Sequence, residues 1–120
     1  MSLVTAPLPR RPESVGAARL LVAEHVTALS ASRRLDAAVL VSELVTNALR
    51  HGTGAITLRV RDDPNVLWVE VADEGSGTLT VNRAPGADGG WGLHIVDELA
   101  DEWGTHGGST RVWFTMAATS

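Results

Sequence analysis

Apolar residues recur along the first half of the chain at the spacing of an α-helix. Over residues 13–29 they stand three or four positions apart, and Pro12 suits the first turn of a helix. The same spacing returns over residues 33–50, where Gly52 and Gly54 end it. The pattern therefore predicts two helices in succession.

The second predicted helix carries apolar residues around much of its circumference, which is typical of a helix buried on more than one side. Ser32 is the N-cap that the sequence indicates. Two polar residues, Glu43 and Asn47, interrupt the apolar surface four positions apart. Because burying an unpaired carboxylate is unfavourable, both residues need an explanation. The apolar positions are Leu35, Val39, Leu40, Val41, Leu44, Val45 and Leu49.

Alternation of apolar and polar residues replaces the helical spacing after this helix. Residues 55–61 alternate as a half-buried strand does, and residues 62–65 have the composition of a turn. Residues 66–73 then return as the second strand of a hairpin. Asp73 is in phase with the apolar side of that strand, so we expect it to point inward.

The remaining segments complete the prediction. Residues 1–12 form an arm whose prolines allow only a short edge strand at Leu3 and Val4, and residues 78–89 have no regular period. Strands joined as hairpins favour an antiparallel sheet. We therefore expect a single domain over residues 1–120, an α/β two-layer sandwich with a mostly antiparallel sheet and helices packed on one face. The other predicted elements are a helix over residues 92–100 and strands over residues 102–105 and 110–117.

The composition excludes several classes of function. The chain has no cysteine, hence no disulfide or thiolate metal site, and its net charge of −4 argues against a nucleic-acid surface. No apolar run is long enough to span a membrane, and the first residues do not resemble a signal peptide, so we expect a cytoplasmic protein without a membrane partner. All ten basic residues are arginine, which excludes the phosphate-binding loop ending in Gly-Lys-Ser/Thr and the strand lysine of eukaryotic-type protein kinases.

Glu43, Asn47 and Arg50 form a row on one face of the second predicted helix. A carboxylate, an amide and a cation in that order suit a triphosphate with Mg²⁺, because Mg²⁺ takes few protein ligands and a carboxylate can activate an attacking hydroxyl or water. The alternative is a solvated stripe on an ordinary helix. The apolar surroundings favour the first interpretation.

Two glycine-containing segments are further candidates. Asp73 is followed by Gly75 and Gly77; the carboxylate can accept from an adenine amino group, and the glycines let the backbone pass close to the base. Gly90 and Gly92 open a helix, whose free N–H groups can bind an anion. The alternatives are a simple turn in the first case and the end of a loop in the second.

A fourth motif precedes the last predicted strand. Thr110 is in phase with the apolar side of that strand, so its hydroxyl would face the same pocket; the alternative is an ordinary turn. In order and spacing over about residues 40–116, the motifs resemble the histidine kinase-like ATPase (GHKL) superfamily of DNA gyrase, a heat-shock chaperone, mismatch-repair ATPases and sensor histidine kinases. The short chain and its proline-rich arm are most similar to bacterial anti-sigma factor serine/threonine kinases. The motifs are Glu43-x-x-x-Asn47-Ala48, Asp73-x-Gly75-x-Gly77, Gly90-x-Gly92-Leu93 and Gly108-Ser109-Thr110.

This resemblance implies the Bergerat ATP-binding fold, with ATP and Mg²⁺ as cofactors. It implies that Glu43 is the catalytic general base, that Asn47 binds Mg²⁺ and that Asp73 binds the adenine amino group. Residues 78–89 would form the lid over the nucleotide. The residues implied to bind the nucleotide are Asn47, Arg50, Asp73, Gly75, Gly77, Gly90, Gly92, Leu93 and Thr110.

The resemblance also implies a function. The chain would bind ATP with Mg²⁺, sequester a sigma factor and phosphorylate a serine or threonine of an antagonist protein, and its relatives suggest a homodimer. The alternatives are a non-catalytic, ATP-responsive binding module, a detached catalytic domain of a sensor histidine kinase, and an ATPase that acts without a partner. Phosphoryl transfer to a partner protein would separate the first function from the second.

Overall fold

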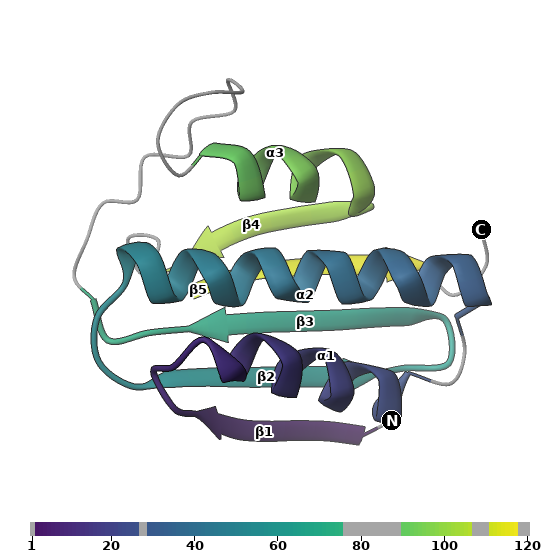
Figure 1. The fold of residues 1–120 in the computed structure, drawn as a ribbon. Helices are drawn as coiled ribbons and strands as arrows, with labels where there is room; N and C mark the ends of the chain where they lie inside the picture. Colours follow the sequence, from purple (N-terminus) through teal and green to yellow (C-terminus); the bar gives the residue numbers. More distant parts are fainter. Residues whose placement is uncertain (1, 27–28, 76–89, 107–110, 118–120) are drawn as a thin grey trace.

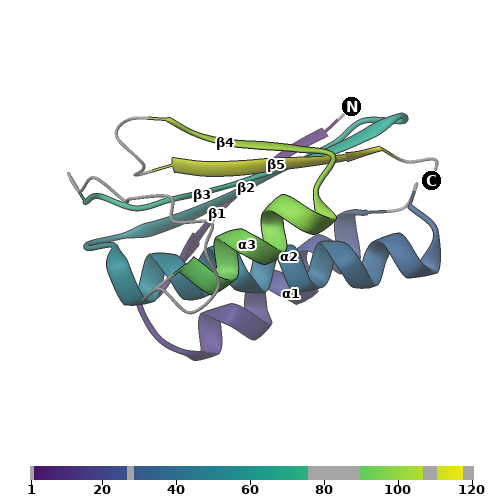
Figure 2. The ribbon, with the colours of Figure 1, turned by 90° about the horizontal axis from the view of Figure 1, so that it is seen from above.

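The computed structural model describes residues 2–26, 29–75, 90–106 and 111–117. Within these ranges, a five-stranded sheet is covered on one face by three helices (Figure 1), and a second view separates the two layers (Figure 2). The elements are β1 (Ser2–Leu8), α1 (Glu13–His25), α2 (Ala31–His51), β2 (Ile56–Asp62), β3 (Val66–Ala72), α3 (Gly90–Leu99), β4 (Glu102–His106) and β5 (Arg111–Ala117).

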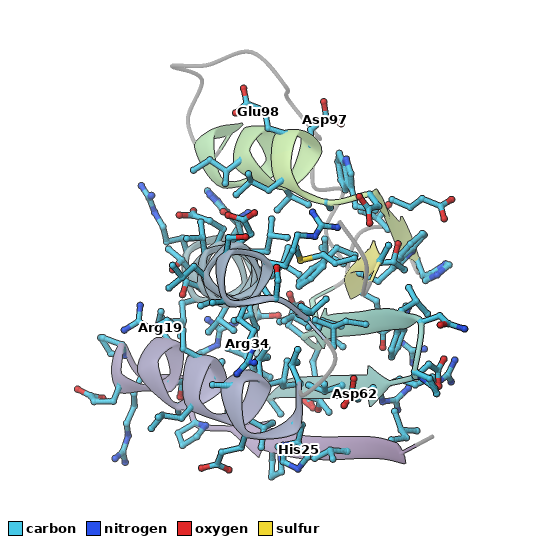
Figure 3. The ribbon with its side chains drawn as sticks, turned by 90° about the vertical axis from the view of Figure 1, so that its right-hand side faces the viewer. Arg19, His25, Arg34, Asp62, Asp97 and Glu98 are labelled. Atoms are coloured by element: carbon cyan, nitrogen blue, oxygen red, sulfur yellow. The ribbon has the colours of Figure 1, made fainter. Side chains whose placement is uncertain are left out.

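Neighbouring strands of the sheet run antiparallel, in the order β1-β2-β3-β5-β4. The register places Val69 between Val60 and Phe114, so apolar side chains of three strands stand in one row. Seen from the side, the helices form a layer separate from the strands (Figure 3). The predicted α/β two-layer sandwich with an antiparallel sheet is confirmed.

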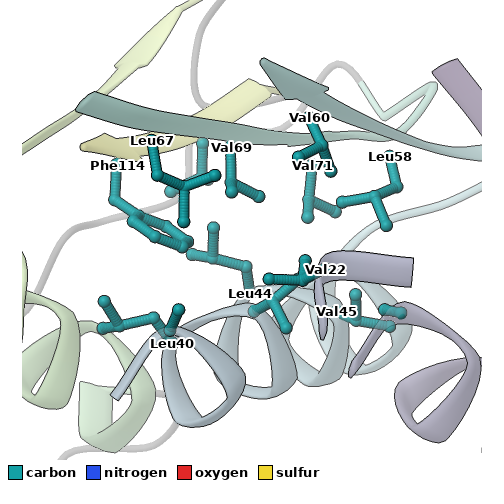
Figure 4. Close-up of a cluster of buried hydrophobic side chains, with 14 of the residues drawn as sticks. Val22, Leu40, Leu44, Val45, Leu58, Val60, Leu67, Val69, Val71 and Phe114 are labelled. Carbon is teal, nitrogen blue, oxygen red and sulfur yellow. The ribbon is translucent and has the colours of Figure 1, made fainter. Parts of the chain in front are cut away.

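The core lies between the sheet and α2. Alternate residues of β2 and β5 are buried, because a period of two places them all on the side that faces the helices. In Figure 4, Leu67 and Phe114 point from the sheet toward Leu40 and Leu44 on α2. The largest fully buried side chains are Phe114, Leu40, Leu44, Ile56, Leu58, Leu67, Met116, Val26, Val41, Val45 and Val60.

The outer side of α2 departs from the prediction. Leu35 and Val39 are 70% and 41% exposed, so the expectation that both are buried is wrong. The sheet, α1 and α3 pack against α2 but leave a strip of its circumference uncovered. The residues on its core side, each at most 2% exposed, are Ala37, Leu40, Val41, Leu44 and Val45.

Strand β1 is longer than the two-residue strand that the prolines predicted. It pairs with β2 along its whole length, including Pro7 opposite Thr57. Because β1 is at the edge of the sheet, half of its backbone groups have no neighbouring strand, and a proline is tolerated there. The arm is therefore an integral part of the sheet.

The helix ends also differ from the prediction. α1 ends at His25, earlier than expected, and α3 begins at Gly90 rather than at residue 92. The N-cap of α2 is Ser30 and not Ser32, because Oγ of Ser30 accepts a hydrogen bond of 3.3 Å from the N–H of Arg33. The sequence located the helices correctly, but the choice of cap depends on where the backbone leaves the extended conformation.

The face of the sheet away from the helices carries polar and aromatic side chains. Arg61 lies over the ring of Trp68, 5.3 Å from its centroid, and Nη1 of Arg59 lies 3.7 Å from Oε1 of the buried Glu70. Both pairs are directly opposite each other in the β2–β3 register. Cross-strand pairs of this kind stabilise a sheet.

Candidate functional site

Three element ends meet at one end of the molecule. The C-terminal ends of α2 and β3 and the N-terminal end of α3 lie together there in both views (Figures 1 and 2). Asn47 and Arg50 lie in the last turns of α2, Asp73 follows β3, and α3 begins at Gly90. The fold thus brings to one end residues that are far apart in the sequence.

Asn47 is the buried polar residue of this region. The residue is 6% exposed, and its Nδ2 has no hydrogen-bond partner among the residues that the structure describes. An unsatisfied polar group in the interior is unfavourable, so this position favours a ligand that bonds to the amide. An amide offers both an oxygen and a nitrogen, which suit a metal ion and a phosphate oxygen respectively.

Glu43, one turn earlier on α2, is half-buried and reachable from outside. It lines an open groove of about 340 Å³ between α1 and α2. Arg19 of α1 (Figure 3) donates a hydrogen bond of 3.4 Å to Oγ of Ser42 in this groove. Arg50 is exposed. The groove residues are Arg19, Leu35, Ala38, Val39, Ser42 and Glu43.

Asp73 is held against the C-terminal end of α2. Its Oδ1 accepts a hydrogen bond of 2.6 Å from the N–H of Gly75. On the other side, a Cβ atom at Gly52 would lie 2.6 Å from Cγ of Asp73 and 2.7 Å from the carbonyl oxygen of Ala48, and closer still to Oδ2 of Asp73. Only glycine fits there. Gly52 is five residues after Asn47, or about 7.5 Å along a helix axis.

The connection from α2 to β2 packs on the turn that follows β3. The N–H of Glu74 donates to the carbonyl oxygen of Thr53 at 2.9 Å, and the N–H of Ala55 donates to Oε2 of Glu74 at 2.9 Å. Gly54 has a φ of 72°, which residues other than glycine rarely adopt, and a Cβ atom there would collide with the Glu74 side chain. These interactions fix the turn that carries Asp73.

The sequence indicated Asp73 and Gly75 but missed the residues that support them. The sequence pattern indicates only that Gly52 and Gly54 end a helix, and it assigns no role to Glu74. The available signal was a pair of glycines two positions apart, directly after a helix that carries candidate site residues. Glycines in such a place can permit a close approach of the backbone as well as end a helix.

The first turn of α3 contains Gly90, Gly92 and Leu93. The first N–H groups of a helix have no partner within the helix, and together with the helix dipole they favour an anion. α3 packs beside α2. Gly77, the predicted lid over residues 78–89 and Thr110 lie outside the described residues, so their predicted roles remain predictions.

The described residues contain no group of three or more histidine, aspartate or glutamate side chains that could hold a metal ion. Among the candidate residues that the structure describes in this region, Asn47 offers an amide oxygen as a metal ligand. Mg²⁺ accepts such a site, because it keeps several waters and binds nucleotide phosphates with few protein ligands. Among the parts of the chain that the structure places, none of the helices is both long and apolar enough to cross a membrane.

Comparison with known proteins gave one family. The family model described as a histidine kinase-like ATPase domain matches residues 8–116. No curated protein matches the chain. The matched region covers most of the chain and contains every candidate residue from Glu43 to Thr110.

Proposed function

The chain belongs to the histidine kinase-like ATPase family, and on that premise we propose that it is a cytoplasmic, ATP-binding regulator of the anti-sigma factor type. In this proposal it sequesters a sigma factor and phosphorylates a serine or threonine of an antagonist protein. ATP binding follows from the family itself. The observation that supports a working nucleotide site is the buried, unsatisfied amide of Asn47, near the end of α2 that Asp73 packs against.

The adenine end of the nucleotide is assigned to the turn after β3. The Asp73 carboxylate would accept a hydrogen bond from the adenine amino group, and such a charge-assisted bond is stronger than a neutral one. A Cβ atom at Gly75 would lie 2.9 Å from Oδ1 of Asp73, so glycine keeps the space beside the carboxylate open. The phosphates would extend toward the N–H groups of Gly90 and Gly92.

Asn47 would hold the metal ion from the side of α2. A Mg²⁺ ion there would neutralise charge on the β- and γ-phosphates, which is the main requirement of phosphoryl transfer. Arg50, exposed one turn later on the same helix, would add positive charge near the phosphates. A metal ion that is bound largely by the nucleotide needs few ligands from the protein.

Glu43 would act on the acceptor hydroxyl. The serine or threonine oxygen forms a bond to the γ-phosphorus while the bond from that phosphorus to the β–γ bridging oxygen breaks. The proton of the hydroxyl passes to the Glu43 carboxylate, and ADP leaves. The open groove beside Glu43 supports this role, because a segment of another protein can reach the carboxylate from outside.

The test separates binding from transfer. Adenine nucleotides are titrated with and without Mg²⁺ by calorimetry, and transfer of the γ-phosphate is followed on candidate antagonist proteins. Glu43→Gln should lower transfer by about 100- to 10,000-fold and change ATP affinity by less than about threefold. Glu24→Gln, at an exposed position of α1, is the matched control. ATP binding with no transfer to any antagonist would contradict the kinase part of the proposal.

A non-catalytic, ATP-responsive binding module is the second candidate. Exposed apolar side chains support it: Leu35 and Val39 border the groove beside Glu43, and neighbouring exposed apolar side chains can mark a surface that contacts another protein. In such a module the nucleotide would shift the population of the form that binds the partner. Partner regulation that survives Glu43→Gln, in a chain that still binds ATP, would favour this function over the kinase.

A further inference from the structure

Arg10 lies in the link between β1 and α1 and holds the C-terminal end of α2. Its guanidinium group donates three hydrogen bonds to backbone carbonyl oxygens: Nη2 to Ala48 at 2.8 Å, Nη1 to Leu49 at 3.0 Å and Nε to Gly54 at 3.0 Å. The carbonyl oxygen of Ala48 also accepts the N–H of Gly52 at 3.0 Å, and the carbonyl groups of a last helical turn form the negative end of the helix dipole. A cation at this place is therefore favourable.

The third of these bonds reaches the peptide group between Gly54 and Ala55. Its carbonyl oxygen accepts from Arg10, and its N–H donates to the Glu74 carboxylate at 2.9 Å. One peptide group is thus held on one side by a cation and on the other by an anion. Hydrogen bonds to charged groups are stronger than neutral ones, so the pair fixes the orientation of this peptide plane.

This peptide group is connected to Asp73 through Glu74. Glu74, which holds its N–H, is the next residue after Asp73 and is also bonded to Thr53 through its own N–H. Gly52, at the start of the same connection, packs directly on the Asp73 carboxylate. The position of the carboxylate therefore depends on a connection that Arg10 anchors from outside.

We propose that Arg10 is a positioning residue for the adenine end of the nucleotide site. It acts through the Gly54–Ala55 peptide group and Glu74, and so sets where the Asp73 carboxylate meets the adenine amino group. This inference rests on the proposed nucleotide site. It makes the N-terminal arm a part of the specificity for adenine, although the arm carries none of the family motifs.

The chemistry requires arginine at position 10. A guanidinium group has five N–H donors in a rigid plane and can serve three carbonyl groups at once, whereas a lysine ammonium has no fixed fork. The next residue, Arg11, is an exposed arginine whose guanidinium makes no hydrogen bond or ion pair with the described residues and lines a separate surface hollow. Arg11→Met therefore removes the same charge from the same link and serves as the matched control.

The first measurement needs no nucleotide. Hydrogen exchange followed by NMR on the full chain gives the exchange rates of two backbone amides. One is the Ala55 amide, which is hydrogen-bonded to the Glu74 carboxylate, and the other is the Val69 amide at the centre of the sheet. Arg10→Met should accelerate exchange at Ala55 by about tenfold or more and leave Val69 within about twofold. Arg11→Met should change neither. Equal acceleration at both amides would show a general loss of stability and would contradict a local positioning role.

The second measurement compares ATP with inosine triphosphate, which lacks the adenine amino group. Arg10→Met should lower the affinity for ATP by about five- to tenfold and leave the affinity for inosine triphosphate almost unchanged. Complete loss of a charge-assisted hydrogen bond would lower affinity by roughly 10- to 100-fold, so the expected effect is a part of that loss. Arg10→Lys should fall between wild type and Arg10→Met, and it replaces Arg10→Met if that variant does not fold. Arg11→Met should keep the wild-type preference.

The outcomes separate this inference from the proposed function. A wild-type chain that binds neither nucleotide contradicts both. A wild-type chain that prefers ATP, with the same preference in Arg10→Met and Arg10→Lys, contradicts only the positioning role. Equal weakening of both nucleotides also contradicts it, because the effect would then not act through the amino group of the base.

Discussion

Replacing Gly52 with alanine would place a methyl group where the structure has the Asp73 carboxylate. The new Cβ atom would lie 2.6 Å from Cγ of Asp73 and 2.7 Å from the carbonyl oxygen of Ala48. The backbone at Gly52 is extended, with φ −90° and ψ −179°, so alanine is not strained by its own dihedral angles. The effect of the substitution therefore comes from the overlap alone.

The overlap is hard to relieve. The oxygen of Ala48 belongs to the helix backbone and accepts the N–H of Gly52 itself at 3.0 Å, so the helix end cannot move away without losing this bond. The Asp73 side chain is short and is tied to the N–H of Gly75. Inserting a methyl group into a packed site of this kind destabilises a protein by about 1–3 kcal/mol. For a domain of this size that is about 4–12 °C in melting temperature.

Urea denaturation and ATP calorimetry measure the two consequences of Gly52→Ala. We expect the free energy of unfolding to fall by about 1–3 kcal/mol. Because Asp73 must move, we also expect the affinity for ATP to fall by about tenfold or more. The affinity for inosine triphosphate should fall less, because that nucleotide lacks the adenine amino group.

Gly16→Ala is the matched control. A Cβ atom at this position in α1 has only the end of the Arg19 side chain nearby, at 3.8 Å. Alanine is favoured over glycine inside a helix, so this variant should gain about 0.5–1 kcal/mol and bind ATP as the wild type does. If Gly52→Ala behaved like Gly16→Ala in both assays, the close approach of α2 to Asp73 would be refuted.

Two further substitutions test other parts of the structure. Asn47→Leu removes a buried amide whose nitrogen has no partner among the described residues, so urea denaturation should find the ligand-free chain as stable as the wild type or up to about 1 kcal/mol more stable. Calorimetry should show that Mg²⁺ no longer strengthens ATP binding. A large loss of stability without ATP would contradict the inference that the amide is unsatisfied until a ligand binds. Ser30→Ala should lower the free energy of unfolding by about 1 kcal/mol, and Ser32→Ala should not, because Ser30 caps α2. A larger loss of stability in Ser32→Ala than in Ser30→Ala would show that Ser32 caps α2, as the sequence indicated.

Local patterns predicted most of the secondary structure. The alternation in β2 and β3 and the helical spacing in α2 were sufficient, because one side of each element packs on the core and leaves a period of two or of about 3.6 in the sequence. The same reasoning failed at Leu35 and Val39. Apolar spacing shows that a side chain could be buried, but the neighbouring elements decide whether anything covers it.

The edge strand shows a second limit of local reasoning. Three prolines within residues 1–12 argued against an extended β1, yet β1 pairs with β2 along its whole length. A proline has no N–H to donate, so it prevents pairing only where its nitrogen would face another strand. Whether a strand lies at an edge is a property of the sheet order, which no local pattern contains.

The two layers, the antiparallel pairing and the motifs that carry Glu43, Asn47 and Asp73 could be predicted from local sequence patterns. These features depend on side-chain identity and short-range spacing, which a sequence records directly. The packing of Gly52 against Asp73 and the hydrogen bonds from Arg10 to the end of α2 are visible only in the folded chain. Both contacts join residues more than twenty positions apart and use backbone atoms or a missing side chain. Because every residue has the same carbonyl group, nothing in the sequence marks which carbonyl an arginine will reach.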